Sequence, residues 1–395
     1  CYANSFSGIG FRNKVRVKKS KLLKLLLRSK YMKIGIVIGR FLPLHTGHVN
    51  LIQRASGIVD KVYVIVSHSK NSDMEMFDNS KFVKEITYKD RLRFVKQTFK
   101  NQRNINAFLF DESNCLPYPN GWEKWASLIK KEMEKREPNL DWENDVLFIS
   151  NRKGDVECNL KYFGSKTKSI DPEYSEYNLN SREIRENPSK YWEFLPREVR
   201  EHIIPLITIC GGESSGKSMM IDKLANVFNT SSAWEYGREY VFEKLGGDED
   251  SLQYSDYEKI VFGHQMNVLY AARNANKFAL IDTDYITTLA FCLTYENKDN
   301  PIIREFVQNY KFDLTILLEN NVKWVNDGLR SIGQEDRRTK FQNLLKELYK
   351  EYDIPYIIVK SSKYEKRYLA CKEIIKAYLN GIRNNKLQEI ADSFI

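Results

Sequence analysis

The chain has 395 residues, enough for two domains of ordinary size, and 42% of them are hydrophobic. No apolar run approaches the roughly 20 residues of a membrane-spanning helix, and the six cysteines are scattered without a CxxC pair, so the sequence excludes an integral membrane protein and predicts a soluble, cytoplasmic one. The net charge of +10 resembles that of nucleic-acid-binding proteins, but residues 1–31 carry nine basic residues and no acidic one, so the excess says little about the folded part.

Residues 1–31 are predicted to lie outside the fold. Met32 stands directly before the first strand and is expected to be the natural start, or close to it. The run Leu22–Leu27 is too short and too charged for a usual signal-peptide core. Two interpretations stay open: a disordered or partly helical basic tail with at most a weak contact to nucleic acid, or an amphipathic helix that binds a surface.

From residue 33 onward, apolar strands alternate with helical patterns, and the alternation restarts near residue 204. This order predicts an α/β protein with two doubly wound parallel sheets, one in a domain at 32–203 and one in a domain at 204–395. Ligands of such sheets bind at the carboxyl ends of the strands. The expected strands are 34–38, 61–67, 105–110, 145–150, 206–210, 278–282, 312–318 and 354–359, and the expected helices include 49–55, 88–99, 122–135 and 219–228.

The turn 39–48 separates the first strand from the first helix. Gly39 and Gly47 let the backbone approach a phosphate group closely, and the imidazole N–H groups of His45 and His48 are suited to donate to phosphoryl oxygens. The helix N-terminus aims further N–H groups at the same place. The turn therefore predicts a phosphate site, and the alternative is a histidine pair that caps or packs the helix.

This turn resembles the GxFxPxHxGH signature of the adenylyltransferase branch of the nucleotidyltransferase superfamily. The resemblance implies that His45 and His48 act on the ATP phosphates during nucleotidyl transfer. It also implies ATP binding by the surrounding turn. The matching residues are Gly39, Phe41, Pro43, His45, Gly47 and His48, and the residues expected to bind ATP include Gly39, Arg40, Phe41 and Gly47.

A second motif of that superfamily, usually ISSTxxR, corresponds to Asn180–Arg185. Ser181 and Arg185 match, and the resemblance implies that they hold ATP phosphates, with Arg185 in a catalytic role. Asn180 stands where serine is usual and Arg182 where threonine is usual. Asparagine is still a good N-cap, and the arginine supplies charge. Whether this altered motif supports adenylyl transfer is left open.

Two further stretches, 111–125 and 185–196, resemble the NadR-type bifunctional enzymes. Those enzymes join a nicotinamide mononucleotide (NMN) adenylyltransferase to a ribosylnicotinamide kinase. A pyridinium ring is a flat cation that favours an aromatic face, which makes Trp122 and Trp125 substrate candidates. The alternative is that both tryptophans pack their helix on the core. Arg152, after the fourth strand, is a candidate for the substrate phosphate.

Residues 211–218 fit the phosphate-loop pattern GxxxxGK[ST] in full, between a strand and a helix. Lys217 is expected to reach the β- and γ-phosphates, and Ser218 to hold Mg²⁺. Asp282 ends the next strand. Its carboxylate is suited to bind Mg²⁺, partly through water, or to accept the proton of the substrate hydroxyl. Asp284 either contacts the substrate or caps the following helix. The predicted ATP-binding residues are Gly211, Gly212, Glu213, Ser214, Ser215, Gly216, Lys217 and Ser218.

Two more segments of the second half resemble the NadR-type kinase. The segment 234–240 contains an EYxRE pattern, which implies that Glu235, Arg238 and Glu239 lie near the nucleoside or the transferring phosphate. The alternative is a charged helix face. The segment 324–330 precedes a lid that is expected to stack a ring and close on the phosphates, against the alternative of a solvated lid face. The lid candidates are Trp324, Arg330, Arg337 and Arg338.

The resemblance covers roughly residues 33–375 and implies an enzyme of NAD salvage. The second domain would phosphorylate ribosylnicotinamide to NMN with ATP and Mg²⁺, and the first would join NMN to a second ATP to give NAD and pyrophosphate. Small molecules are the expected partners, a homo-oligomer is left open, and DNA repression is not carried over. Two rivals remain: the same folds acting on another nucleotide and nucleoside, or a nucleotide-sensing regulator with weak catalysis.

Overall fold

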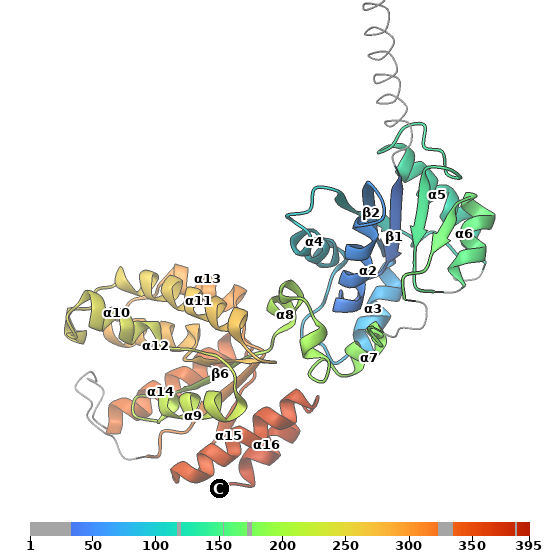
Figure 1. Ribbon diagram of the computed structural model, residues 1–395. Helices are drawn as coiled ribbons and strands as arrows, with labels where there is room; N and C mark the ends of the chain where they lie inside the picture. Colours follow the sequence, from blue (N-terminus) through green and yellow to red (C-terminus); the bar gives the residue numbers. More distant parts are fainter. Residues whose placement is uncertain (1–32, 117–119, 153, 172–175, 323–334, 384) are drawn as a thin grey trace, which may run out of the picture. The chain divides into compact units, whose positions relative to one another are not determined.

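The computed structural model describes residues 33–116, 120–152, 154–171, 176–322, 335–383 and 385–395 (Figure 1). The predicted tail, Trp324 and Arg330 lie outside the described residues. The chain divides into two compact units between Val199 and Arg200, a boundary that falls within helix α8 (Arg197–Ile203). Within the described ranges, no helix is both long enough and apolar enough to cross a membrane.

The first unit is built on one five-stranded sheet in the order β3-β2-β1-β4-β5, and all its strand pairs are parallel. The expected strands and helices are present, and the structure adds the short elements α3, α6 and β5. The elements are β1 Ile34–Gly39, α2 Thr46–Ser56, β2 Lys61–His68, α3 Lys70–Asp78, α4 Tyr88–Thr98, β3 Ile105–Asp111, α5 Trp122–Glu134, β4 Val146–Ile149, α6 Asp155–Phe163, β5 Lys166–Lys168, α7 Ser181–Glu186, the 3₁₀ turn η1 Trp192–Phe194 and α8 Arg197–Ile203.

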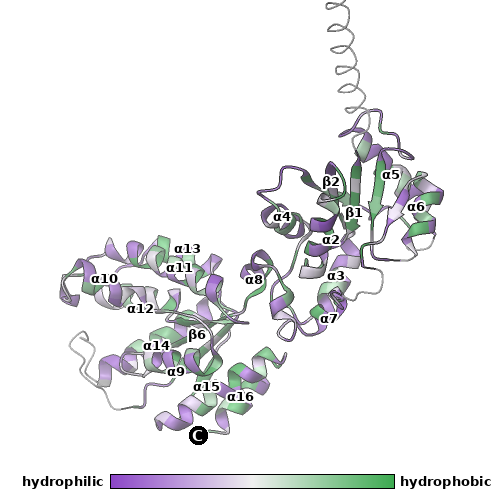
Figure 2. Ribbon diagram, in the orientation of Figure 1, coloured by the Kyte–Doolittle hydropathy of each residue, from purple (hydrophilic) through white to green (hydrophobic). Residues whose placement is uncertain are grey.

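The sheet of the first unit is covered on both faces. Alternate strand residues such as Ile34 and Ile36 pack with α5 and α6 in one cluster. Helices α2 and α4 contact β1, β2 and β3 and bury their own apolar stripes. Figure 2 shows the central strand β1 in green, the hydrophobic end of the scale, between helices that carry hydrophilic residues. Burial on both faces is why these strands are continuous apolar runs rather than alternating ones.

The second unit holds another parallel five-stranded sheet, in the order β10-β9-β6-β8-β7. The prediction of two doubly wound parallel sheets is therefore confirmed. The elements are β6 Leu206–Gly211, α9 Lys217–Phe228, β7 Ser232–Ala233, α10 Tyr236–Lys244, the 3₁₀ turn η2 Glu249–Ser251, α11 Asp256–Asn274, β8 Ala279–Asp282, α12 Tyr285–Tyr295, α13 Pro301–Asn309, β9 Leu314–Leu318, α14 Glu335–Glu351, β10 Ile357–Val359, α15 Tyr364–Leu379 and α16 Asn385–Asp392.

One hydrophobic cluster of this unit packs α11, α12, α13 and α14 against one face of the sheet, and it includes Tyr285 and Tyr349. Helices α9, α15 and α16 contact strands β6, β8 and β10. In each unit the first strand lies inside the sheet, between two strands that follow it in sequence. These neighbours are β2 and β4 for β1, and β8 and β9 for β6, so the strand order changes direction at the first strand. Such a switch in strand order opens a crevice at the carboxyl ends of the strands.

Helix α11 also carries exposed apolar side chains at helical spacing, namely Phe262, Met266, Leu269 and Tyr270. Scattered apolar residues are normal on a protein surface, and only contiguous patches indicate a contact site. The homo-oligomer therefore stays a prediction.

Candidate active sites

The histidine turn of the first unit lies at the carboxyl end of β1. His45 is the N-cap residue of α2 and is only 5% exposed, but its side chain makes no capping hydrogen bond. Its ring stacks on His48, one helical turn further on, with centroids 3.7 Å apart. Phe41 also packs against His48 in a T-shaped pair, with ring centroids 5.0 Å apart. A Cβ atom at Gly47 would lie 3.1 Å from His45 Nδ1, so this position has little room for a side chain.

The altered second motif meets this turn. Asn180 caps α7 by accepting a hydrogen bond from the N–H of Arg182, as the sequence predicts. Arg185 Nη1 donates to the carbonyl of Leu42 at 2.6 Å, and Ser181 Oγ lies 3.5 Å from the carbonyl of Pro43. Two motifs about 140 residues apart in sequence therefore face each other, which is the geometry that binding one nucleotide phosphate chain requires.

Burial sets the protonation of the two histidines. It lowers the pKa of His45 to about 4. The pKa of His48 is lowered by burial, by His45 and by the cation of Arg152. Both rings are therefore neutral near pH 7, and the Nδ1 atoms of both have no hydrogen-bond partner in the described part of the chain. A neutral imidazole keeps one N–H group, which is suited to donate a hydrogen bond to a phosphoryl oxygen.

The buried His45 is expected to make the folded chain less stable in acid. Because its pKa is about 4 in the fold and 6.5 in the unfolded chain, the unfolded chain binds a proton that the folded one does not. Stability therefore falls as the pH decreases from 6.5 towards 4, by about 2 kcal/mol at pH 5 from this ring. Urea unfolding of the wild type and of His45→Gln at pH 8 and pH 5 measures the difference. Equal losses in both proteins would contradict it.

Arg40 extends the first site toward the predicted tryptophans. Its guanidinium bonds Glu112 at 2.8 Å and lies 3.5 Å from Asp73. Glu112 also accepts from Trp125 Nε1 at 3.3 Å. Trp125 and Trp122 pack against each other and on the core cluster, as the alternative interpretation proposed. Their contact with substrate stays a prediction, and the network ties only Trp125 to the turn.

Arg91, which was not predicted from the sequence, holds the histidine turn 39–48 by hydrogen bonds. Its side chain is completely buried on α4. It donates to the carbonyls of Arg40 and Ser67, and it pairs with Asp73. In sequence it is one basic residue of an amphipathic helix, so only its burial in the fold identifies it.

The phosphate loop of the second unit has the backbone that the motif requires. Ser214 and Gly216 have positive φ angles of 58° and 86°, which turn successive N–H groups toward one point. A Cβ at Gly211 would meet Ser215 Oγ at 2.8 Å and the carbonyl of Leu318 at 3.0 Å, so only glycine fits there. Lys217 is 4% exposed at the first position of α9.

The two aspartates after β8 differ in what their oxygens contact. Asp284 caps α12: one oxygen accepts from the Thr287 backbone and hydroxyl, and the other from the Tyr349 hydroxyl at 2.8 Å. Asp282 Oδ1 is buried and has no hydrogen-bond partner among the described residues. Burial and the charge of Glu235 raise the pKa of Asp282 to about 6, against the opposing effects of Lys217 and Ser218. Asp282 is therefore the carboxylate with capacity for a ligand.

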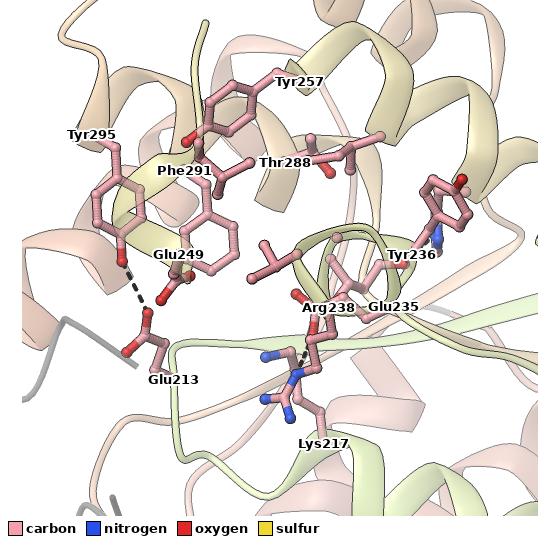
Figure 3. Close-up of a pocket in the computed structure, with 16 residues that line it drawn as sticks. Glu213, Lys217, Glu235, Tyr236, Arg238, Glu249, Tyr257, Thr288, Phe291 and Tyr295 are labelled. Carbon is pink, nitrogen blue, oxygen red and sulfur yellow. Dashed lines mark hydrogen bonds and ion pairs between the residues drawn. The ribbon is translucent and has the colours of Figure 1, made fainter. Parts of the chain in front are cut away.

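A pocket opens beside Lys217 and is lined by α10, α11, α12 and the turn η2 (Figure 3). Two predicted residues, Glu235 and Arg238, line it and pair at 3.3 Å. Burial disfavours the Glu235 carboxylate, but Lys217 and Arg238 outweigh it and lower the pKa. Glu239 is exposed on α10, accepts from Asn267 and does not line the pocket. Aromatic rings complete the lining, and they are Tyr236, Tyr257, Phe291 and Tyr295.

Buried arginines hold the phosphate loop to the rest of the unit. Arg338 is 6% exposed and reaches the carbonyl of Glu213 at 3.5 Å, whereas Arg337 is exposed. Arg367, which the sequence analysis missed, is 1% exposed on α15. It donates to the carbonyls of Ser215, Ser361 and Glu319 at 2.8, 2.5 and 2.6 Å respectively.

Comparison with known proteins matches each unit to a family. Residues 36–187 match the cytidylyltransferase-like family, and residues 206–367 match the AAA domain. The trifunctional NAD biosynthesis/regulator protein NadR of Salmonella typhimurium strain LT2 is 45% identical over 356 residues, which are 90% of this chain and 86% of that protein. The chain belongs to the NadR family. The NadR protein of Escherichia coli K12 is also 45% identical, over 89% of this chain and 84% of its own length.

The fold agrees with solved NadR structures. A NadR protein crystallised with NR superposes with a TM-score of 0.71 at 23% identity and covers 89% of this chain and 97% of its own. Another, in complex with NAD and AMP-PNP, gives 0.70. NadR membership confirms the predictions of an NAD biosynthesis enzyme that joins a nucleotidyltransferase to a P-loop nucleoside kinase.

Proposed function

We propose that the pocket beside Lys217 binds ribosylnicotinamide and that the phosphate loop binds ATP. Aromatic faces and carboxylates suit a flat cation such as the pyridinium ring. The single observation that supports this assignment is that Lys217, Glu235 and Arg238 line one pocket. A nucleoside bound there would lie next to the phosphate loop. Products are NMN and ADP.

In this reaction the 5′-oxygen of the nucleoside forms a bond to the γ-phosphorus, and the bond from phosphorus to the β,γ-bridging oxygen breaks. The hydroxyl proton passes to a pocket carboxylate. Glu235 is suited to accept it, because Lys217 and Arg238 keep it ionised. Lys217 and the loop N–H groups stabilise charge on the phosphoryl oxygens.

Mg²⁺ fits the residues at the end of β8. Magnesium prefers oxygen ligands and takes one or two from the protein and the rest from phosphates and water. Ser218 and the buried, unpartnered oxygen of Asp282 supply that set. When bound, the ion would neutralise negative charge on the ATP phosphates.

The first unit is proposed to join NMN to a second ATP. The NMN 5′-phosphate oxygen bonds to the α-phosphorus, and pyrophosphate leaves. His45, His48 and Arg185 surround the turn and would stabilise charge on the phosphoryl oxygens, with Arg152 near the substrate phosphate. We place both reactions in the cytoplasm, where their nucleotide substrates occur.

Production of NAD tests this assignment. Purified protein supplied with ribosylnicotinamide, ATP and Mg²⁺ should form NAD, with NMN as a transient intermediate resolved by chromatography. Accumulation of NMN alone would show that the altered motif at Asn180–Arg185 does not support adenylyl transfer. Other nucleosides in the same assay distinguish this function from the rival, in which the same folds act on another nucleoside and nucleotide. Phosphopantetheine is a useful negative control for adenylyl transfer. The reason is that a phosphopantetheine adenylyltransferase of Mycoplasma capricolum is 26% identical over 39% of this chain.

A further inference from the structure

The nucleoside pocket contains more carboxylates than its catalysis needs. Glu213, Glu235 and Glu249 line it together with two cations, Lys217 and Arg238. Glu235 pairs with Arg238, and Lys217 belongs to the phosphate loop. Glu213 accepts a hydrogen bond from Tyr295 at 3.1 Å. The charge of Glu249 remains without an assigned role.

Glu249 is placed at the aromatic side of the pocket. It begins the turn η2, and Figure 3 shows its carboxylate beside Phe291, with Glu213 below. Its Oε2 atom is buried and has no hydrogen-bond partner in the described part of the chain. Burying a carboxylate among like charges costs free energy unless a ligand compensates it. A cation beside Phe291 and Tyr295 would compensate it.

We propose that Glu249 is a specificity-determining residue whose carboxylate attracts the positively charged base of the nucleoside. The kinase site then favours a cationic nucleoside over an uncharged nucleoside of the same shape. This inference rests on the proposed assignment of the pocket to ribosylnicotinamide. The aromatic faces alone hold either ring, so the discrimination comes from charge.

The surroundings of Glu249 make this discrimination sensitive to pH. Burial, Glu213 and Glu235 raise the pKa of Glu249 to about 7, Asp250 adds to this, and Arg238 opposes it. Tyr257 faces the same carboxylate and stays neutral, because burial raises its pKa. Below pH 7 the carboxylate takes up a proton and its attraction for a cation is lost, so KM for a cationic nucleoside should rise as the pH falls.

The test compares two substrates on the full chain. One is ribosylnicotinamide, and the other is its 1,4-dihydro form, which keeps the ribose and the carboxamide but lacks the ring charge. Glu249→Gln should lower kcat/KM for the cation roughly tenfold, as expected for loss of one charge at a few ångströms, and leave that for the dihydro form unchanged. Between pH 8 and pH 6, KM for the cation should rise in the wild type and stay level in the variant.

Matched variants keep the result interpretable. Asp250→Asn removes a neighbouring charge that is exposed and outside the pocket lining, and it should retain the preference. Glu249→Asp keeps the charge and should restore most of the preference, which a purely structural role would not require. Circular dichroism and phosphorylation of the dihydro substrate report folding of the kinase unit.

Equal losses for both substrates in Glu249→Gln would overturn the inference while leaving the proposed function intact. A wild type that phosphorylates neither substrate would overturn the proposed function itself, and the inference with it.

Discussion

Replacing Lys217 with alanine is expected to lower the kinase rate by at least about 10²-fold, the usual effect of losing one preorganised charge at a phosphoryl oxygen. The reason is that Lys217 is buried at the start of α9 and its ammonium group is the cation that the loop itself presents to the phosphates. Adenylyl transfer from ATP to NMN should stay at the wild-type rate, because its residues belong to the other unit. Separate coupled assays for ADP and for pyrophosphate measure the two rates.

Lys223→Ala is the matched control, since Lys223 lies on the same helix and is exposed. It should leave the kinase rate unchanged. Loss of both activities in Lys217→Ala would show that the two sites do not act independently.

The converse experiment is expected from His45→Ala. Adenylyl transfer should fall about 10²–10³-fold, as when one donor to a developing oxyanion is removed. Removal of this ring also takes away the stacking surface of His48, whose centroid lies 3.7 Å away. Phosphorylation of ribosylnicotinamide should continue.

His202→Ala serves as the control for a histidine outside both turns, and it should change neither rate. A His45→Ala protein that still makes NAD from NMN at the wild-type rate would contradict the assignment of this turn to ATP phosphates.

Local sequence pattern predicted the fold and located the two turns that are proposed to bind phosphate. Both turns connect a strand to a helix, and their glycines, histidines and lysine are contiguous in sequence, so pattern alone locates them. Parallel strands that are buried on both faces also appear in the sequence as continuous apolar runs, so they can be predicted locally. The meeting of Arg185 with Leu42 followed from the superfamily motif, because no local pattern links residues 143 positions apart.

The remaining parts of the sites depend on tertiary packing. Glu249 lies in a short polar turn, and Arg91 and Arg367 lie on ordinary amphipathic helices, so their sequence surroundings are unremarkable. Only the fold shows that one carboxylate enters a pocket and that two guanidinium groups are buried. The same holds for Asp284, where sequence left two roles open and the Thr287 and Tyr349 contacts show a helix cap.

The position of Arg367 has a consequence for dissecting the protein. Its three acceptor carbonyls belong to the phosphate loop, to the residue after β9 and to the segment after β10. One side chain of helix α15 therefore joins the phosphate loop to two other segments by hydrogen bonds. A fragment that stops before α15 keeps every residue of the phosphate-loop motif but leaves these buried carbonyls without a donor. The minimal kinase fragment able to bind ATP therefore extends well past the phosphate-loop motif and includes α15. Fragments shortened from the C-terminus should lose affinity for ATP although every residue of that motif is still present.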